Sequence, residues 1–263
     1  MNEKVLANKT ALVTGASSGL GVDFARQLAA RGANLVLVAR RPDQLCSVAA
    51  EIEKEYAVSA LPITMDLAEP AAPQALYDQL EQQGVQIDIL VNNAGFGVFG
   101  KFVEIPWERH QAMLDIDIVA LTHLTRLFLP DMLSRSFGYV LQVASNGAYQ
   151  PTPTYAAYSA AKSYVLSKGE AINYELRGSG VSVTVISPGV TATEFLMVSG
   201  QPPSFYQRPV HMDSETVARI GIASMLRRRP SVVPGFINSL VAFSTRLVPR
   251  RTLAPLAYYS MTK

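Results

Sequence analysis

The chain has 263 residues, of which 49% are hydrophobic and 17% are charged. This composition is typical of a globular protein with a large core, and it excludes a disordered or fibrous chain. The formal net charge of +2 gives no general basic field, so nucleic acid is not expected as a partner. A single cysteine excludes an internal disulfide, and the sequence has no run of about 18 apolar residues that would predict a membrane span. Because the chain starts without an apolar leader segment, we expect a cytoplasmic location.

Short β-rich runs alternate with longer helical patterns. The predicted strands are Thr10–Thr14, Asn34–Ala39, Ala60–Met65, Ile87–Asn92, Gly138–Ser145 and Val181–Ser187. Apolar residues have helical spacing over Leu20–Arg31, Asp43–Glu55, Ala72–Gln83, Trp107–Leu133 and Ala156–Arg177. This βαβ repetition predicts an α/β fold, with a doubly wound, Rossmann-like parallel sheet and helices on both faces. No linker interrupts the pattern, so residues 1–263 are predicted to form a single domain.

The regular alternation ends after Gly189. A stretch over about residues 190–212 that contains proline and serine is predicted to be a lid, and it precedes a helix from Ser214 and a short strand near Val232. The tail, about residues 230–263, places apolar residues between two groups of arginines. We expect this tail to close a pocket or to pack on a partner subunit. The alternative is peripheral contact with a membrane, since apolar stretches flanked by arginine favour anionic interfaces.

A glycine-rich turn follows the first predicted strand and leads directly into a helix. Its sequence over residues 14–21 is Thr-Gly-Ala-Ser-Ser-Gly-Leu-Gly. Backbone amides in such a turn can approach a pyrophosphate at the positive end of the helix. The alternative is a helix start that Ser17 or Ser18 caps, with glycines that serve only the turn. The surrounding βαβ repetition favours a dinucleotide site, whose predicted residues are Gly15, Ser17, Ser18, Gly19, Leu20 and Gly21.

The end of the second strand indicates which dinucleotide is expected. Folds that prefer NAD place a carboxylate there for the ribose hydroxyls, whereas this sequence has Ala39 followed by Arg40 and Arg41. An arginine at this point can pair with a 2′-phosphate, so NADP(H) is the predicted cofactor. The alternative is that both arginines are solvated charges at a strand end. Asp66, after the third strand, could accept a hydrogen bond from the adenine amino group or cap the next helix.

A tyrosine and a lysine lie four residues apart in a strongly helical segment. This spacing puts Tyr158 and Lys162 on one face of the helix, about one turn apart. A neighbouring ammonium group stabilises a phenolate, so we expect Lys162 to lower the pKa of Tyr158 and fit it for general acid–base work. Ser145 ends the fifth strand, at the edge where ligands of open α/β sheets bind. Its hydroxyl is predicted to polarise a carbonyl oxygen. Tyr155, seven residues before Lys162, is not expected to take this role.

Together these motifs resemble the short-chain dehydrogenase/reductase family. The matching segments are residues 14–21, Asn92-Asn93-Ala94-Gly95, Ser145 and the Tyr158 and Lys162 pair, in that order. The resemblance covers about residues 9–193. It implies an NAD(P)-dependent oxidoreductase that transfers a hydride to or from a small carbonyl or alcohol substrate without a metal, and it implies a homo-oligomer.

The resemblance also implies roles for individual residues. Lys162 would contact the nicotinamide ribose, and Asn93 would help to hold the cofactor. The segment Ser187-Pro188-Gly189, with Val190 and Thr193, would face the carboxamide. The three histidines have no metal-ligand spacing, so no metal site is predicted.

One position departs from the family pattern. Where the family has a catalytic asparagine, in the helix after Trp107, this chain has Asp117. A catalytically impaired NADP(H)-binding regulator is therefore kept as an alternative to an enzyme. The presence of Ser145, Tyr158 and Lys162 favours the enzyme, with Asp117 as a fourth candidate catalytic residue. An epimerase or dehydratase is disfavoured, because those relatives are usually longer.

The substrate is expected to be a hydrophobic carbonyl compound. This expectation depends on apolar and aromatic residues that the sequence would place around the pocket, namely Phe96, Phe99, Tyr149, Met197 and Phe205. The alternative is that these side chains are core residues that cover the sheet.

Overall fold

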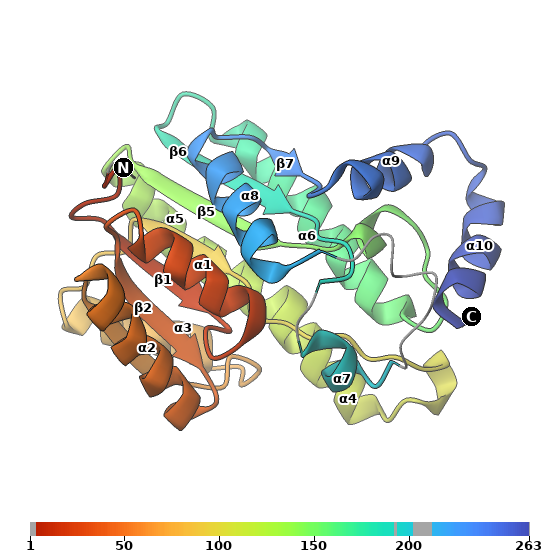
Figure 1. Cartoon of the computed structure of the whole chain (residues 1–263), viewed down its shortest axis with the longest axis horizontal. Helices are drawn as coiled ribbons and strands as arrows, with labels where there is room; N and C mark the ends of the chain where they lie inside the picture. The colour runs from red at the N-terminus through yellow and green to blue at the C-terminus, as the bar shows by residue number, and fades with distance from the viewer. Residues whose placement is uncertain (1–3, 192–193, 202–211, 263) are drawn as a thin grey trace.

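The computed structural model describes residues 4–191, 194–201 and 212–262, and one seven-stranded parallel sheet runs through them (Figure 1). The strand order is β3-β2-β1-β4-β5-β6-β7, the doubly wound Rossmann-like order that the sequence predicts. The strands are β1 Thr10–Thr14, β2 Asn34–Ala39, β3 Ala60–Thr64, β4 Ile89–Asn92, β5 Gly138–Val143, β6 Val181–Ile186 and β7 Ser231–Val232. Each of the first six strands agrees with its prediction to within two residues at either end.

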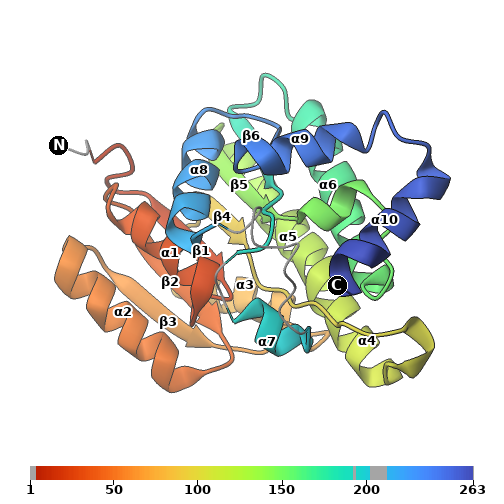
Figure 2. The same cartoon turned by 45° about the vertical axis from the view of Figure 1, so that its right-hand side comes forward.

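The main helices pack on the two faces of the sheet (Figures 1 and 2). The α-helices are α1 Gly19–Ala29, α2 Pro42–Tyr56, α3 Ala72–Gln82, α4 Trp107–Leu114, α5 Leu121–Ser134, α6 Ala156–Glu175, α7 Phe195–Ser199, α8 Ser214–Leu226, α9 Phe236–Ser244 and α10 Arg250–Thr262. Three short helical segments complete the described elements: η1 Phe102–Glu104, η2 Asp115–Ala120 and η3 Asn146–Tyr149.

Two apolar cores lie on opposite faces of the sheet. Successive residues of β1 point to different faces, so Val13 joins the core beneath α1, α2 and α8, whereas Leu12 joins the core beneath α3 and α5. Burial on both faces explains why these strands are continuous apolar runs.

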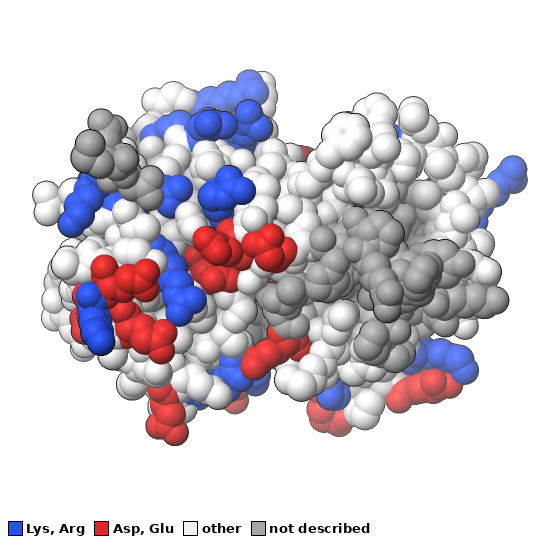
Figure 3. Space-filling model, in the orientation of Figure 1, with Lys and Arg blue, Asp and Glu red and all other residues white. Residues whose placement is uncertain are grey.

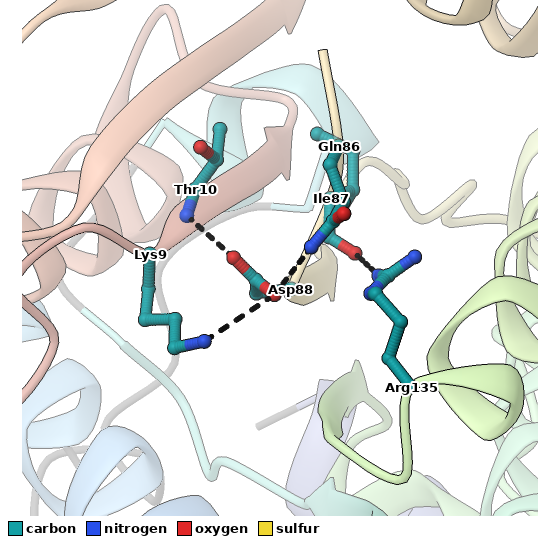
Figure 4. Close-up of polar contacts among 6 residues, drawn as sticks. All are labelled: Lys9, Thr10, Gln86, Ile87, Asp88 and Arg135. Carbon is teal, nitrogen blue, oxygen red and sulfur yellow. Dashed lines mark hydrogen bonds and ion pairs between the residues drawn. The ribbon is translucent and has the colours of Figure 1, made fainter. Parts of the chain in front are cut away.

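A buried carboxylate binds neighbouring chain segments at the amino edge of the sheet (Figure 4). Asp88, which is 4% exposed, accepts hydrogen bonds from the Thr10 backbone at 3.1 Å and the Gln86 side chain at 3.3 Å, and Lys9 lies 3.8 Å away. Nearby, Arg135 donates to the Ile87 carbonyl at 2.8 Å and so ties the end of α5 to β4. This network fixes the amino edge of the sheet and leaves the opposite edge to ligands. There, chain connections leave β1 and β4 in different directions, as ligand sites of this fold require.

The single helix predicted over Trp107–Leu133 was wrong. The segment consists of α4, a π-helical turn over Asp115–Ala120, and α5. A π turn adds a residue to one turn and shifts the apolar pattern after it by one position, and a shift this small is not distinguished from the ordinary scatter of a helical pattern. Asp117 lies in this turn with no exposed surface, beside Gly95. A Cβ atom at Gly95 would collide with Asp117 Oδ1, which explains why the residue is glycine.

The contact between Gly95 and Asp117 leads to a prediction about the stability of the protein. Gly95→Ala should lower the free energy of unfolding by about 1–3 kcal/mol, because the new methyl group and the carboxylate claim the same space. In an Asp117→Ala background the same change should cost much less. Urea unfolding of the four proteins of this double-mutant cycle measures the difference. An equal cost in both backgrounds would mean that Gly95 and Asp117 do not touch.

Candidate active site

A cavity of about 620 Å³ opens at the carboxyl edge of the sheet. This volume lies within the range of about 300–1,000 Å³ for small-molecule sites. Its walls include most of the predicted site residues: Gly15, Ser17, Ser18, Gly19, Leu20, Gly21, Arg40, Arg41, Asn93, Ser145, Tyr158, Lys162 and Val190. Asp66 and Asp117 are not part of the wall, and Thr193 lies outside the described residues.

The turn after β1 requires its glycines. Gly15 has a φ of +68°, which disfavours other residues, and a Cβ atom at Gly21 would collide with the Gly15 carbonyl. Ser18 is the N-cap residue of α1, yet its side chain makes no capping hydrogen bond there. The first amides of α1 therefore remain available at the cavity wall, contrary to the alternative in which Ser18 caps this helix.

Asn93 fixes this turn rather than projecting freely into the cavity. Its Nδ2 donates to the Thr14 carbonyl at 2.9 Å. The Thr14 hydroxyl accepts from the backbone amides of Asn93 at 3.0 Å and Ala94 at 2.9 Å, and it donates to Val91. Thr14 was not among the predicted site residues, although its place at the end of β1 was a signal that could have found it. Together Thr14 and Asn93 join the glycine-rich turn to the end of β4.

The two arginines after β2 differ in their contacts. Arg40 has a side chain 63% exposed and lies 3.6 Å from Asp66. Asp66 also accepts from the Ala68 amide at 3.0 Å, so it stabilises a turn ahead of α3. Arg41 donates to Ser17 Oγ and to Glu194, both at 3.2 Å, and thereby joins the glycine-rich turn to the segment before α7. A hydrogen bond with Ser18, and then one with Arg41, lowers the pKa of Glu194.

Ser145 and Tyr158 meet in the cavity. Ser145 follows β5 and is the N-cap of η3, where its Oγ accepts from the Gly147 amide at 3.1 Å. Tyr158 lies in the first turn of α6, partly buried at the cavity wall, and its hydroxyl is in a hydrogen bond with Ser145. Ser145 and Tyr158, both predicted site residues, are therefore brought together from the end of β5 and from α6.

Lys162, one turn after Tyr158, is held in a buried position. Its Nζ donates to the Val143 carbonyl at 3.2 Å and lies 3.5 Å from Asp117 Oδ1. The side chains of Lys162 and Asp117 are 5% and 0% exposed, so little water screens this ion pair. Burial raises the pKa of Asp117 to about 6, and the charge of Lys162 opposes this shift. The ion pair with Lys162 favours the ionised form of Asp117.

The pKa of Tyr158 is raised, whereas the sequence analysis expected Lys162 to lower it. Burial raises the pKa of Tyr158 above its ordinary value, the negative charge of Asp117 raises it further, and the hydrogen bond with Ser145 lowers it only in part. The Lys162 ammonium lies 5.6 Å from the centre of the Tyr158 ring but much closer to Asp117, which offsets its charge. Tyr158 consequently keeps its proton.

An aromatic wall stands beside Tyr158. Phe195, the first residue of α7, has its ring centroid 5.4 Å from that of Tyr158, and Tyr155 lies 5.6 Å from Tyr158. The buried Tyr155 hydroxyl lies 2.8 Å from Ser199 Oγ and 2.9 Å from Gln201 Oε1, so it fastens α7 to the start of α6. The short helix α7 and its Phe195 were not predicted, because five residues show no periodicity.

Of the four predicted pocket residues that the structure describes, Phe96 alone lines the cavity. Phe99 packs against Tyr155 instead, with ring centroids 5.4 Å apart. Tyr149 lines a neighbouring hollow between η3, α6 and α10, and Met197 is 75% exposed. Phe205 lies outside the described residues. The error arose because loop residues were assigned to the pocket without knowledge of the loop path.

Helix α9 closes one side of the cavity. Asn238 accepts a hydrogen bond from Asn146 at 3.1 Å, and it packs so closely on Gly189 that a Cβ atom there would overlap its side chain. Asn238, Val241, Ala242 and Thr245 line the cavity. Part of the tail therefore lines the cavity, and the roles predicted for the tail remain predictions.

Comparisons with known proteins agree with this geometry. The family model described as short chain dehydrogenase matches residues 9–203. The very-long-chain 3-oxoacyl-CoA reductase of Anas platyrhynchos is 31% identical over 243 residues, which cover 89% of this chain and 76% of the relative. A short-chain dehydrogenase from Sphingobium yanoikuyae, solved in complex with NADPH, superposes with a TM-score of 0.81 at 29% identity and covers 91% of this chain and 94% of its own. A 7beta-hydroxysteroid dehydrogenase structure superposes with a TM-score of 0.88 at 25% identity and covers 98% and 99%. The chain belongs to the short-chain dehydrogenase/reductase family.

Proposed function

We propose that this protein is an NADP(H)-dependent reductase of hydrophobic ketones or aldehydes. The observation that supports it most directly is the Tyr158 hydroxyl, which lies beside Ser145 at the wall of a cavity that also contains a glycine-rich turn. A phenol with a raised pKa is a poor base near neutral pH but a ready proton donor. The proposal therefore favours reduction of a carbonyl over oxidation of an alcohol at neutral pH.

The cavity suits a dinucleotide phosphate. Gly15 and Gly21 allow close approach of the backbone, and the uncapped amino end of α1 favours negative charge. Arg40, which is largely exposed and only 3.6 Å from Asp66, is the side chain we assign to the 2′-phosphate. Arg41 would support it from the other side of the turn through Ser17. When bound, the nicotinamide supplies the hydride.

Ser145, Tyr158 and Lys162 would then each take a different part in the reaction. Ser145 would hold the substrate oxygen by a hydrogen bond, and Tyr158 would donate its proton to that oxygen as negative charge develops on it. Lys162 would hold the nicotinamide ribose while its charge remains paired with Asp117. We assign Val190 and Pro188 to the carboxamide end of the cavity, where both line the wall. In this assignment Asp117 acts through Lys162 and does not touch the substrate.

The hydrophobic substrate class follows from the wall beside Tyr158. Phe96, Phe195, Leu196, Val198 and Val241 line this part of the cavity and offer apolar surface to a ligand. The similar proteins named above include a very-long-chain 3-oxoacyl-CoA reductase and a 7beta-hydroxysteroid dehydrogenase, whose names give a long acyl chain and a steroid. A homo-oligomer remains a prediction for this chain.

The catalytic assignment is tested by removal of the proton donor. Tyr158→Phe should lower the turnover of NADPH with a panel of aliphatic and aromatic ketones by about 10²-fold or more, since it removes the side chain that we assign as the proton donor. Cofactor affinity, measured by fluorescence titration, should stay nearly unchanged. Tyr155→Phe is the matched control, because the Tyr155 hydroxyl bonds to Ser199 and Gln201 and is not assigned a part in proton transfer. If Tyr158→Phe keeps most of its activity, another group is the acid. If the wild-type protein binds NADPH but reduces no ketone, the regulatory alternative is favoured.

The cofactor assignment is tested by comparison of the two dinucleotides. NADPH should bind the wild-type protein about tenfold more tightly than NADH or better, because one charged hydrogen bond to a phosphate contributes about 1.5–3 kcal/mol. Arg40→Ala should remove most of this difference, whereas Lys54→Ala, an exposed cation on α2 away from the cavity, should not. Isothermal titration of both dinucleotides measures it. Equal wild-type affinities for NADPH and NADH would contradict the assignment.

A further inference from the structure

Helix α9 has two faces of different character. Asn238 and Ala242 are buried and line the cavity. On the opposite face, Phe236, Leu240 and Phe243 follow each other at spacings of four and three residues and are 82%, 55% and 55% exposed. This spacing puts the three side chains on one stripe of the helix. Large apolar side chains that project from a helix in such a stripe mark a contact surface rather than a core.

Exposed apolar side chains also lie next to the stripe. Ile237, within α9, is 50% exposed, and Leu247, after the end of the helix, is 74% exposed. Figures 1 and 2 place α9 and α10 together on one side of the molecule, away from α1 and α2. In Figure 3 the region at the upper right, where Figure 1 shows α9, has no charged side chains over a broad area, and blue Lys or Arg side chains lie at its right-hand edge.

All charged side chains in the last part of the chain, from residue 216 onward, are positive. Residues 216–263 contain no Asp or Glu, and their cations are Arg219, Arg227, Arg228, Arg229, Arg246, Arg250, Arg251 and Lys263. Arg246, Arg250 and Arg251 follow the stripe directly, are exposed, and have no ion pair with the described part of the chain. Apolar side chains next to unpaired arginines complement a surface that is apolar inside and anionic outside.

We propose that α9 and the start of α10 bind the surface of an anionic lipid bilayer. Phe236, Leu240 and Phe243 would enter the boundary between headgroups and acyl chains, and Arg250 and Arg251 would contact lipid phosphates. Among the described helices none is long and apolar enough to cross a bilayer, so the contact is peripheral. A second copy of this chain fits the surface less well, because a two-fold contact would bring the arginines of both copies together without acids.

The proposal connects the lipid to the cavity. Because α9 forms a wall of the cavity with one face and the stripe with the other, docking would place the cavity beside the bilayer. An apolar ketone dissolved in lipid would then be near the cavity. This consequence depends on the proposed function, whereas binding to lipid does not.

Vesicle flotation of the full-length protein tests the proposal. At low salt the protein should float with vesicles of equal parts phosphatidylcholine and phosphatidylglycerol, and much less with phosphatidylcholine alone. Phe236→Ser/Leu240→Ser should lower the lipid-bound fraction about tenfold. Arg250→Glu should lower it about fivefold and weaken its salt dependence. No flotation with anionic vesicles at low salt would overturn the proposal.

Matched variants distinguish lipid binding by the stripe from nonspecific binding by any exposed apolar or charged side chain. Phe102→Ser/Val103→Ser removes two apolar side chains that are 59% and 89% exposed on η1, and Lys54→Glu reverses a charge on α2. Both should float like the wild type, and loss equal to that of the stripe variants would overturn the proposal. Circular dichroism and reduction of a water-soluble ketone verify that each variant is folded. Sedimentation velocity measures the oligomeric state of the wild type and of the stripe variant. If the wild type does not float and the stripe variant dissociates an oligomer, the stripe is an interface between copies of the chain, and the proposal is wrong.

Discussion

The buried ion pair between Lys162 and Asp117 is the interaction on which the site depends. Charges withdrawn from water are stabilised only if they are paired and hydrogen-bonded, and loss of one partner from such a pair costs about 3–5 kcal/mol. Several features hold this pair in place. The π-helical turn presents Asp117, Gly95 leaves room for its carboxylate, and the Val143 carbonyl at the end of β5 accepts from Lys162. The path of the chain at the carboxyl edge of β4 and β5 is thus adapted to one carboxylate.

This pairing changes what Tyr158 can do. An unpaired ammonium near the ring would favour the phenolate, but Asp117 offsets that charge and adds its own negative charge nearby. The tyrosine stays protonated, and Ser145 keeps its hydroxyl in place at the cavity. The sequence analysis predicts that Asp117 stands where the family has an asparagine, and such a change need not destroy the site. In our proposal it is biased toward proton donation.

The sequence predicted the fold well because burial of a parallel sheet on both faces produces continuous apolar runs such as Leu35–Ala39, which are easy to identify. It also predicted that Ser145, Tyr158 and Lys162 share one site, and all three line the cavity, since their positions relate directly to strand and helix ends. It could not reveal the π turn, because an added residue shifts the apolar pattern by only one position between α4 and α5. Nor could it show that Asp117 faces Lys162, or that Phe195 and α9 complete the cavity, because those contacts join segments far apart in the chain.

The pKa of Tyr158 tests the central claim most directly. Tyrosine labelled with carbon-13 at Cζ reports ionisation by NMR, and Tyr158→Phe assigns the signal. In the wild-type protein without cofactor, Tyr158 should keep its proton above pH 10, the ordinary pKa of tyrosine being about 10, and Asp117→Asn should lower its pKa. Alcohol oxidation, which requires the phenolate, should then begin at lower pH in Asp117→Asn. Ionisation of wild-type Tyr158 near neutral pH, or identical titrations in the two proteins, would contradict the claim that Asp117 keeps the tyrosine protonated.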